Sequence, residues 1–314
     1  MMLAYVIDAY LLKQRSLGMR FESAEQLLRR FCRVMGNPEI DEITPEAVAA
    51  FLNGTGALGA TWMLKYRVLT GFYRFALSRG HVGRSPLPTT SPKLPPQQTP
   101  YVYSTEELRR LLEATSILRV GNSSEVPVMY RTLLLLLYGT GMRIGEALRL
   151  TLQDVDLTEQ VITVRDTKFF KTRLVPIGPK LSQELGEHVE CRRLLLLSRG
   201  EASPLFTTRG GRPWHYVGVI SRFQHVRRAA GVVCPIGEPR LPRLHDIRHT
   251  AVVHRVLAWY RSGQDVQRLL PQLATYLGHI DVRSTQHYLQ MTSDLLQAAN
   301  QRFAQYAMEA THEG

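Results

Sequence analysis

A proline-rich stretch constrains this chain more than any other feature. Residues 85–100 read SPLPTTSPKLPPQQTP and contain six prolines. Proline lacks an amide hydrogen and fixes φ, so a helix cannot run through this stretch, and its polar residues suit an extended linker. At 314 residues the chain is also long enough for two domains. We predict a first domain over residues 1–84, a linker over 85–100 and a second domain over 101–314.

The first domain has the patterns of helices. The segment FESAEQLLRRFCRVMG has apolar residues at helical spacing, with Ser23 as the predicted N-cap and Gly36 just past its end. In TPEAVAAFLNG, Thr44 is the predicted cap and Pro45 suits the first turn. A third predicted helix spans residues 61–80, where cations alternate with aromatic and apolar residues. These cations form either an ordinary solvated face or a DNA-binding face; they are Lys65, Arg67, Arg74 and Arg79.

The second domain combines helices with one small sheet. Ser104 and Glu107 have the spacing of a capping box at the start of a helix. A buried helix, a glycine turn and another helix are expected over residues 126–156. Two short β-rich runs, QVITVRD and RLVPIG, flank the segment DTKFFKT in the pattern of a hairpin. From about residue 213 the pattern is helical again, so the expected fold is mainly α with a small antiparallel β-sheet.

Charge and composition narrow the function. The net charge of +12 favours a polyanionic partner, nucleic acid first and an anionic membrane surface second. No apolar run approaches the ~20 residues that a membrane span needs. The apolar start of the chain is interrupted by Asp8 and reads as a helix, so we expect a cytoplasmic protein. Cys32, Cys191 and Cys234 are far apart and lack CxxC spacing, which argues against a disulfide or a zinc site.

Four separated segments hold arginine, lysine, histidine and tyrosine residues in helix-turn or hairpin contexts. An arginine after a glycine turn is usually a surface residue, and a lone histidine is usually a satisfied polar group. In HDIRH the arginine would repel a cation and no carboxylate or cysteine stands at ligand spacing, so no metal site is predicted. The segments are GTGMRIGEAL with Arg143, DTKFFKTRLVPIG with Lys168, LHDIRHT with His245 and Arg248, and LGHIDVRSTQHY with His279 and Tyr288.

In this order the four segments closely resemble the tyrosine recombinase family, which includes phage integrases, Xer-type recombinases and recombinases of transposable elements. The resemblance spans about residues 101–292, and the first domain matches more loosely. It implies a helical, SAM-like N-terminal DNA-binding domain and an α/β catalytic domain. The hairpin offers two lysines. The spacing to RLVPIG puts Lys168 in the catalytic position of the family, which leaves Lys171 and Arg173 as candidates for DNA contacts.

The resemblance and the chemistry of phosphodiester cleavage point to the same roles. Charge builds on the nonbridging oxygens, and the guanidiniums of Arg143 and Arg248 can clamp them with paired donors. His245 and His279 can add hydrogen bonds and handle the proton of the tyrosine. Tyr288 attacks phosphorus and stores the bond as a 3′-phosphotyrosine.

Further residues have supporting roles or ordinary ones. Lys168 can protonate the departing 5′ oxygen. Glu146 matches an acidic position that helps to hold the active site of the family, although a surface helix glutamate explains it nearly as well. Tyr276 is expected to pack in the core, and the role of Tyr260 is open. No Walker A sequence is present, and a phosphotyrosine conserves bond energy, so neither ATP nor any other cofactor is expected.

The expected partners are double-stranded DNA recombination sites, with two protomers at each site and four in a synaptic complex. Other recombinases could take part. The hairpin and the tail are closer to transposon-borne members than to Xer proteins, which suggests transposition. Three alternatives stay open: a type IB-like topoisomerase, a catalytically inactive DNA-binding regulator and a basic protein of membrane surfaces. A last predicted helix starts near Asp294, and its apolar stripe packs either in cis or on a neighbouring protomer.

Overall fold

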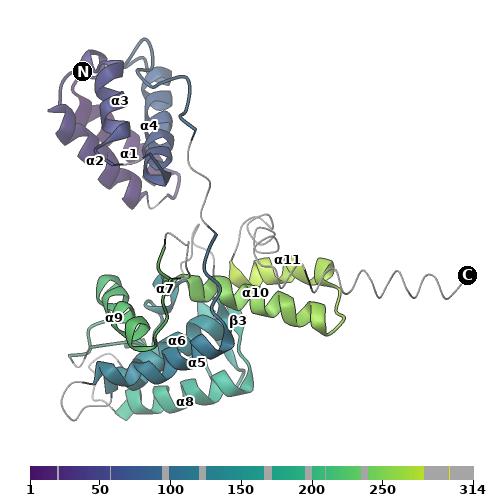
Figure 1. Cartoon of the computed structure of the whole chain (residues 1–314). Helices are drawn as coiled ribbons and strands as arrows, with labels where there is room; N and C mark the ends of the chain where they lie inside the picture. Colours follow the sequence, from purple (N-terminus) through teal and green to yellow (C-terminus); the bar gives the residue numbers. More distant parts are fainter. Residues whose placement is uncertain are drawn as a thin grey trace, which may run out of the picture. The chain divides into compact units, whose positions relative to one another are not determined.

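The chain folds into two compact units, Met1–Gln98 and Thr99–Gly314, whose division falls inside the proline-rich stretch (Figure 1). The structure is a computed structural model, which describes residues 1–19, 21–56, 58–93, 99–119, 125–165, 172–194, 200–208, 210–234, 240–278 and 297.

The first unit is a bundle of helices around an apolar core. Tyr10, Phe31 and Phe72 lie at the centre of that core, where aromatic rings meet edge to face. Tyr66 donates a hydrogen bond to the carbonyl of Pro88 at 3.0 Å, so the start of the proline-rich stretch packs on this unit. The helices are α1 (Leu3–Ser16), α2 (Glu22–Met35), η1 (Ile40–Glu42), α3 (Pro45–Asn53) and α4 (Ala60–Ser78).

Local sequence signals predicted two ends of these helices correctly and one wrongly. Thr44 caps α3 by accepting a hydrogen bond from the amide of Ala47, with Pro45 at the first position, as predicted. Gly36 ends α2 in the left-handed conformation, also as predicted. The prediction that Ser23 caps α2 is wrong, because the helix begins at Glu22 after Phe21, whose φ of 53° turns the chain into it.

The second unit combines helices with a three-stranded antiparallel sheet in the order β1-β2-β3, which confirms the expected fold class. The capping box of Ser104 and Glu107 forms as predicted at the start of α5. The first elements are α5 (Thr105–Glu113), η2 (Ala114–Leu118), α6 (Glu125–Thr140), α7 (Ile144–Ala147), η3 (Leu152–Asp154), β1 (Val155–Asp156), β2 (Val161–Val164) and β3 (Arg173–Pro176). The rest are α8 (Pro179–Leu194), η4 (Gly200–Ala202), α9 (Tyr216–Ala229), α10 (Asp246–Arg261) and α11 (Val266–Leu277).

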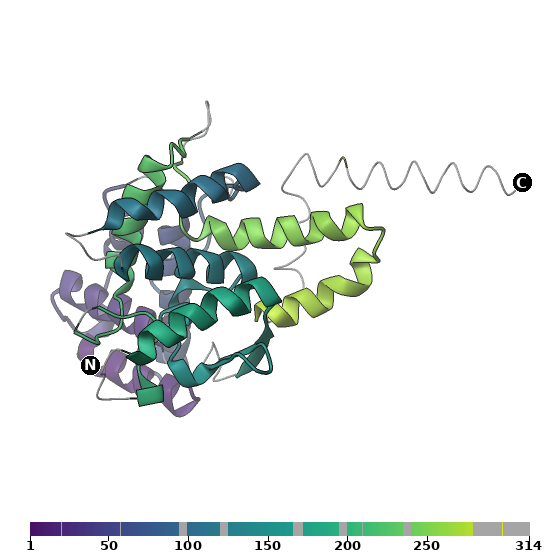
Figure 2. The same ribbon diagram turned by 90° about the horizontal axis from the view of Figure 1, so that it is seen from below.

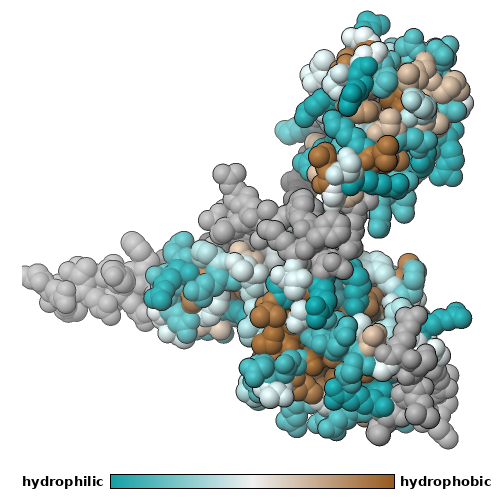
Figure 3. Space-filling model, turned by 180° about the vertical axis from the view of Figure 1, so that it is seen from behind, coloured by the Kyte–Doolittle hydropathy of each residue, from teal (hydrophilic) through white to brown (hydrophobic). Residues whose placement is uncertain are grey.

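Helix α6 runs through the middle of this unit, and leucines cover its buried faces. Helices α10 and α11 lie side by side as an antiparallel pair with their own apolar core (Figures 1 and 2). Hydrophilic side chains dominate the visible surface of both units, with apolar side chains in smaller areas (Figure 3). The predicted helix near Asp294 lies outside the described residues, apart from Gln297.

Candidate active site

The turn from α6 into α7 presents Arg143 to solvent. Gly141 has a φ of 62°, and Arg143 follows in an extended conformation at the N-cap of α7. Its backbone amide and its Nη1 each donate to the carboxylate of Glu146 at 3.0 Å. The side chain is nevertheless 42% exposed, so its guanidinium is held on one side and open on the other. This arrangement leaves donors free to approach an anionic ligand.

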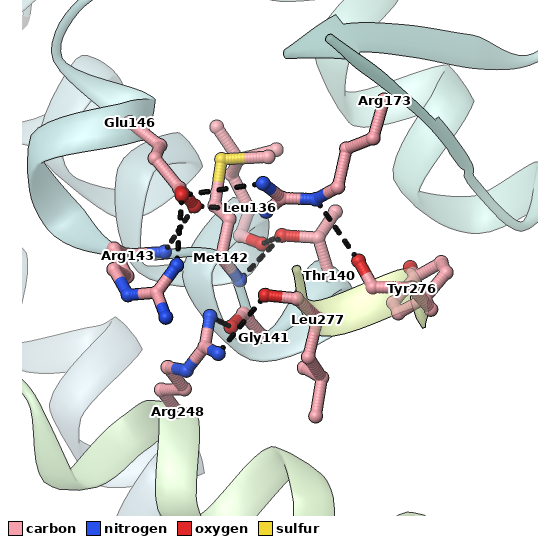
Figure 4. Close-up of polar contacts among 10 residues, drawn as sticks. All are labelled: Leu136, Thr140, Gly141, Met142, Arg143, Glu146, Arg173, Arg248, Tyr276 and Leu277. Atoms are coloured by element: carbon pink, nitrogen blue, oxygen red, sulfur yellow. Dashed lines mark hydrogen bonds and ion pairs between the residues drawn. The ribbon is translucent and has the colours of Figure 1, made fainter. Parts of the chain in front are cut away.

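Glu146 is the centre of a buried charge cluster (Figure 4). Its side chain is 4% exposed and also accepts from Nη1 and Nη2 of Arg173, at 3.2 and 2.8 Å. Burial alone would raise the pKa of this carboxyl. Hydrogen bonds from Arg173 and from the Arg143 backbone, with the charges of both arginines, outweigh burial and lower the pKa to about 2. Glu146 is therefore a buried anion that holds two arginines, and not a surface helix residue.

Arg248 is buried in α10, with 3% of the residue exposed. Nη1 donates to the carbonyl of Gly141 at 2.6 Å, and Nη2 donates to the carbonyl of Leu277 at 3.0 Å. The first acceptor lies two residues before Arg143, and the second lies at the end of α11 (Figure 4). A neutral carbonyl holds a guanidinium without cancelling its charge. The two arginines predicted to clamp phosphate are thus brought to one turn, although 105 residues separate them in the sequence.

Two histidines stand at the start of α10. The rings of His245 and His249 meet edge to face, with centroids 5.0 Å apart. Partial burial lowers the pKa of His245 although the residue is exposed overall, and the charges of Arg248 and Arg243 lower it further. Burial and the neighbouring His245 lower the pKa of His249 to about 4. At neutral pH these rings are therefore neutral, which lets one ring nitrogen accept a proton and the other donate a hydrogen bond.

The positive charge of Arg143 also lowers the pKa of His245, so these two side chains interact electrostatically. The segment before α10 is anchored by Asp246, a buried carboxylate that accepts from the backbone amide and guanidinium of Arg243. Of the predicted catalytic residues, Arg143, His245 and Arg248 are therefore brought together with Glu146.

The other predicted catalytic residues lie outside the described residues. They are Lys168, His279 and Tyr288, and the same holds for the DNA-contact candidate Lys171. Strands β2 and β3 pair in register from Val161 opposite Pro176 to Val164 opposite Arg173, which confirms the hairpin on either side of residues 166–171. Helix α11 ends at Leu277, two residues before His279. Strands β2 and β3 therefore flank the segment that contains Lys168, and α11 ends just before the segment that contains His279 and Tyr288.

Arg173 is placed differently from the prediction that it contacts DNA. Its side chain is 11% exposed, and its guanidinium is taken up by Glu146 and by the carbonyl of Tyr276, 3.1 Å from Nε. Because the guanidinium nitrogens of Arg173 donate to groups inside the protein, they are not available to bind a DNA phosphate. The alternation of side chains along a strand predicts that Arg173 faces inward. It lies on the same face of β3 as the buried Val175, while Leu174 on the other face is exposed.

The cations of α4 divide into two kinds. Arg67, Arg74 and Arg79 are exposed, as a DNA-binding face requires. Lys65 instead donates to the carbonyls of Phe51 and Leu52, at 2.6 and 3.3 Å. Its ammonium also lies over the Phe51 ring, 4.9 Å from the centroid. Lys65 therefore closes the end of α3, and a DNA contact does not fit its surroundings.

Other expectations can be compared with the described part of the chain. Tyr276 is half-buried between the two cores, and its hydroxyl donates to the carbonyl of Pro176 at 3.2 Å, so it packs as predicted. Cys32, Cys191 and Cys234, which all lie within the described ranges, form no disulfide. Within the described ranges, no group of histidine, cysteine and acidic residues could hold a metal ion, and no helix is long and apolar enough to cross a membrane.

Comparison with known proteins identifies the family. Residues 102–294 match the phage integrase family. A Sinorhizobium fredii protein named as the integrase/recombinase y4rB is 31% identical over 299 residues, covering 94% of this chain and 95% of that protein. The tyrosine recombinase XerD of Corynebacterium glutamicum is 29% identical over 280 residues, covering 86% of both.

Solved structures agree on the fold. The Tn1549 transposon integrase in complex with a circular intermediate DNA superposes with a TM-score of 0.68 at 18% identity, covering 96% of this chain and 100% of that one. A lambda integrase tetramer bound to a Holliday junction gives 0.65 at 18% identity, covering 92% and 77%. With the family match and the geometry above, the chain belongs to the phage integrase family of site-specific tyrosine recombinases, enzymes that cleave and rejoin DNA strands.

Proposed function

We propose that the chain cleaves DNA through Tyr288 and that Arg143, Arg248 and His245 form the described part of its active site. One observation carries this proposal: Arg248 donates to the Gly141 carbonyl at 2.6 Å and so fixes the turn that presents Arg143. Two guanidiniums at one turn suit the nonbridging oxygens of a phosphodiester, where charge builds in the transition state.

The reaction balances with residues of this chain. The Tyr288 hydroxyl oxygen bonds to phosphorus, and the bond from phosphorus to the 5′ oxygen breaks. A neutral histidine such as His245 takes the tyrosine proton, and Lys168 donates a proton to the departing 5′ oxygen. The product is a 3′-phosphotyrosine and a free 5′ hydroxyl. Rejoining reverses these steps with the 5′ hydroxyl of a partner strand, so the bond energy is kept and no nucleotide is consumed.

The assembly follows from the chemistry of strand exchange. We place two protomers on each recombination site and four in the synaptic complex. The lambda integrase dimer bound to a core site and the tetramer bound to a Holliday junction support this arrangement. The Tn1549 integrase supports a role in transposition. Acting on DNA, the protein is expected to work in the cytoplasm, and other recombinases could join it.

The substitution Tyr288→Phe tests the proposal. Binding selection from random-sequence duplexes gives a half-site, and a nick near its cleavage position makes a suicide substrate that traps the covalent complex. Wild-type protein should form an adduct that survives a denaturing gel. The Phe variant should form none while it binds the half-site with unchanged affinity, because only the nucleophilic oxygen is lost. An adduct in the Phe variant would overturn the assignment.

A further inference from the structure

Arg173 opens β3, directly after the hairpin segment that contains Lys168. It pairs with Val164 across the sheet, and strand alternation turns its side chain to the same face as the buried Val175. A buried guanidinium is costly unless its donors are satisfied. The structure satisfies this one with a carboxylate and a backbone carbonyl from two other elements.

The first of these contacts is a bidentate pair with Glu146. Nη1 and Nη2 of Arg173 lie 3.2 and 2.8 Å from its two carboxylate oxygens. The same oxygens accept from the Nη1 and the backbone amide of Arg143 (Figure 4). Glu146 therefore stands between the two arginines, and the position of one guanidinium is relayed to the other through a single carboxylate.

The second contact ties Arg173 to the end of α11. Nε donates to the carbonyl of Tyr276 at 3.1 Å, and the Tyr276 hydroxyl donates back to β3 at the carbonyl of Pro176. Gly278, which follows α11, has a φ of 68°, and a Cβ there would lie 2.7 Å from Nη1 of Arg173. The guanidinium therefore packs against the backbone one residue before His279.

We propose that Arg173 is a positioning residue for strand cleavage. Through Glu146 it holds the guanidinium of Arg143, and through the Tyr276 carbonyl it fixes the end of α11, from which the chain continues to His279. This role rests on the proposed function and replaces the DNA contact that the sequence suggested. One side chain thereby links β3, α7 and α11.

The substitution Arg173→Met separates positioning from DNA contact. The methionine keeps an apolar side chain of similar reach and removes every donor. Single-turnover cleavage of the suicide substrate at saturating DNA should fall about 100-fold, the effect expected when a reacting group is misplaced by about 1 Å. Half-site affinity and its salt dependence should stay unchanged. The proposal fails if cleavage at saturation is unchanged, or if the salt slope falls by about 1, as the loss of a phosphate contact requires.

Arg165 offers a matched control on the same hairpin. It stands at the end of β2 and pairs with the buried Asp154, with Nε 2.7 Å from Oδ1. This is also an arginine–carboxylate pair, although the Arg165 side chain is 58% exposed, and its described contact is with Asp154 rather than with Arg143 or α11. Arg165→Met should therefore cleave at the wild-type rate at saturating DNA. An equal loss of cleavage rate in both variants would mean that any change to the hairpin slows cleavage. That result would contradict a specific role for Arg173.

A double-mutant cycle tests the relay through Glu146 and guards against misfolding. Arg173→Met alone leaves a buried carboxylate with one arginine fewer, whereas the double variant with Glu146→Gln removes that charge. If Arg173 acts through Glu146, the double variant loses no more activity than the worse single variant. Independent roles would multiply the losses, to about 10,000-fold if each single loss is about 100-fold, and that result would overturn the relay.

Hydrogen exchange of the full chain without DNA tests the positioning apart from catalysis. In Arg173→Met, the amides of residues 141–148 and 273–278 should exchange faster, with no change in the first unit. In Arg165→Met, both segments should stay protected. Unchanged exchange in Arg173→Met would overturn the proposal even if its cleavage is slow. Absence of an adduct in wild-type protein would instead overturn the proposed function, and the exchange result would still decide the role of Arg173.

Discussion

The two units of the chain differ in whether they bury polar and charged side chains. Among the described residues, every buried polar or charged side chain lies in the second unit, and the buried side chains of the first unit are all hydrophobic. Three cations of the first unit are exposed, Arg67 and Arg74 on α4 and Arg79 directly after it. The second unit buries the side chain of Glu146 to 4% exposure and Arg248 to 3%.

The buried charged side chains lie in the unit that holds the candidate active site. Burying a charge costs several kcal/mol unless it is paired. In the second unit, buried carboxylates each hold an arginine that is more exposed than they are. Glu146 holds Arg143, and Asp246 holds Arg243 in the same i,i+3 arrangement. The first unit has no buried charged side chain among its described residues.

The largest expected effect is on the two arginines that meet at the α6–α7 turn. Arg143→Ala and Arg248→Ala should each slow cleavage about 100-fold or more, the usual cost of losing one preorganised charge donor. Arg248→Ala should also destabilise the protein by about 2 kcal/mol, more than Arg143→Ala, because the buried carbonyls of Gly141 and Leu277 lose their donors. Single-turnover cleavage and denaturant unfolding measure the two effects.

These two variants also bear on the contrast between exposed and buried charge. A near-wild-type cleavage rate in either one would make that arginine structural. Equal destabilisation of both would contradict the difference in burial between an Arg143 side chain that is 42% exposed and an Arg248 residue that is 3% exposed.

The next effect is on stability at low pH. The pKa of Glu146 is lowered to about 2, so its contribution to folding is present above the ordinary pKa of 4.5 and is lost as pH falls toward 2. A shift of this size corresponds to about 3 kcal/mol. Calorimetry of the full chain should show the second unit losing stability over this range. Glu146→Gln should be less stable at pH 7, and its stability should approach that of wild type as pH falls toward 2. Parallel curves would contradict the assignment.

The smallest effect concerns the basic face of α4. Replacing Arg67, Arg74 or Arg79 with Gln should each reduce the salt slope of DNA binding by about 1, since each loses one phosphate contact. Lys65→Met is the control, because its ammonium is occupied by carbonyls at the end of α3. It should lower stability and leave the slope unchanged. A slope change in Lys65→Met equal to that of the arginine variants would remove the distinction.

What the sequence predicted well depends on neighbouring residues. The caps at Thr44 and Ser104 formed as expected because the hydroxyl that accepts and the backbone amide that donates lie three residues apart. The β2–β3 hairpin formed because alternation and turn lie in one segment. Arg143 and Arg248 were recognised as a pair through their motifs. The Ser23 cap failed because Phe21 adopts a left-handed conformation that no local pattern announced.

What the sequence missed depends on contacts between distant segments. Arg173 and Lys65 both looked like surface cations suited to DNA. The acceptors that claim Arg173 lie 27 and 103 residues away in the chain, and those of Lys65 lie 13 and 14 residues away. The positions of cations in the sequence do not distinguish a side chain that binds a DNA phosphate from one that hydrogen-bonds within the protein. The alternation of β3 could have separated them for Arg173, because it placed that residue on the buried face.

Mapping the covalent bond tests Tyr288 as the nucleophile most directly. Wild-type protein is trapped on the nicked suicide duplex and digested with trypsin and nuclease, and the peptide that carries a nucleotide is identified by mass spectrometry. We predict the peptide of residues 284–302, in which Tyr288 is the single tyrosine. A nucleotide on the peptide of residues 269–283, whose single tyrosine is Tyr276, or on any other peptide, would contradict it.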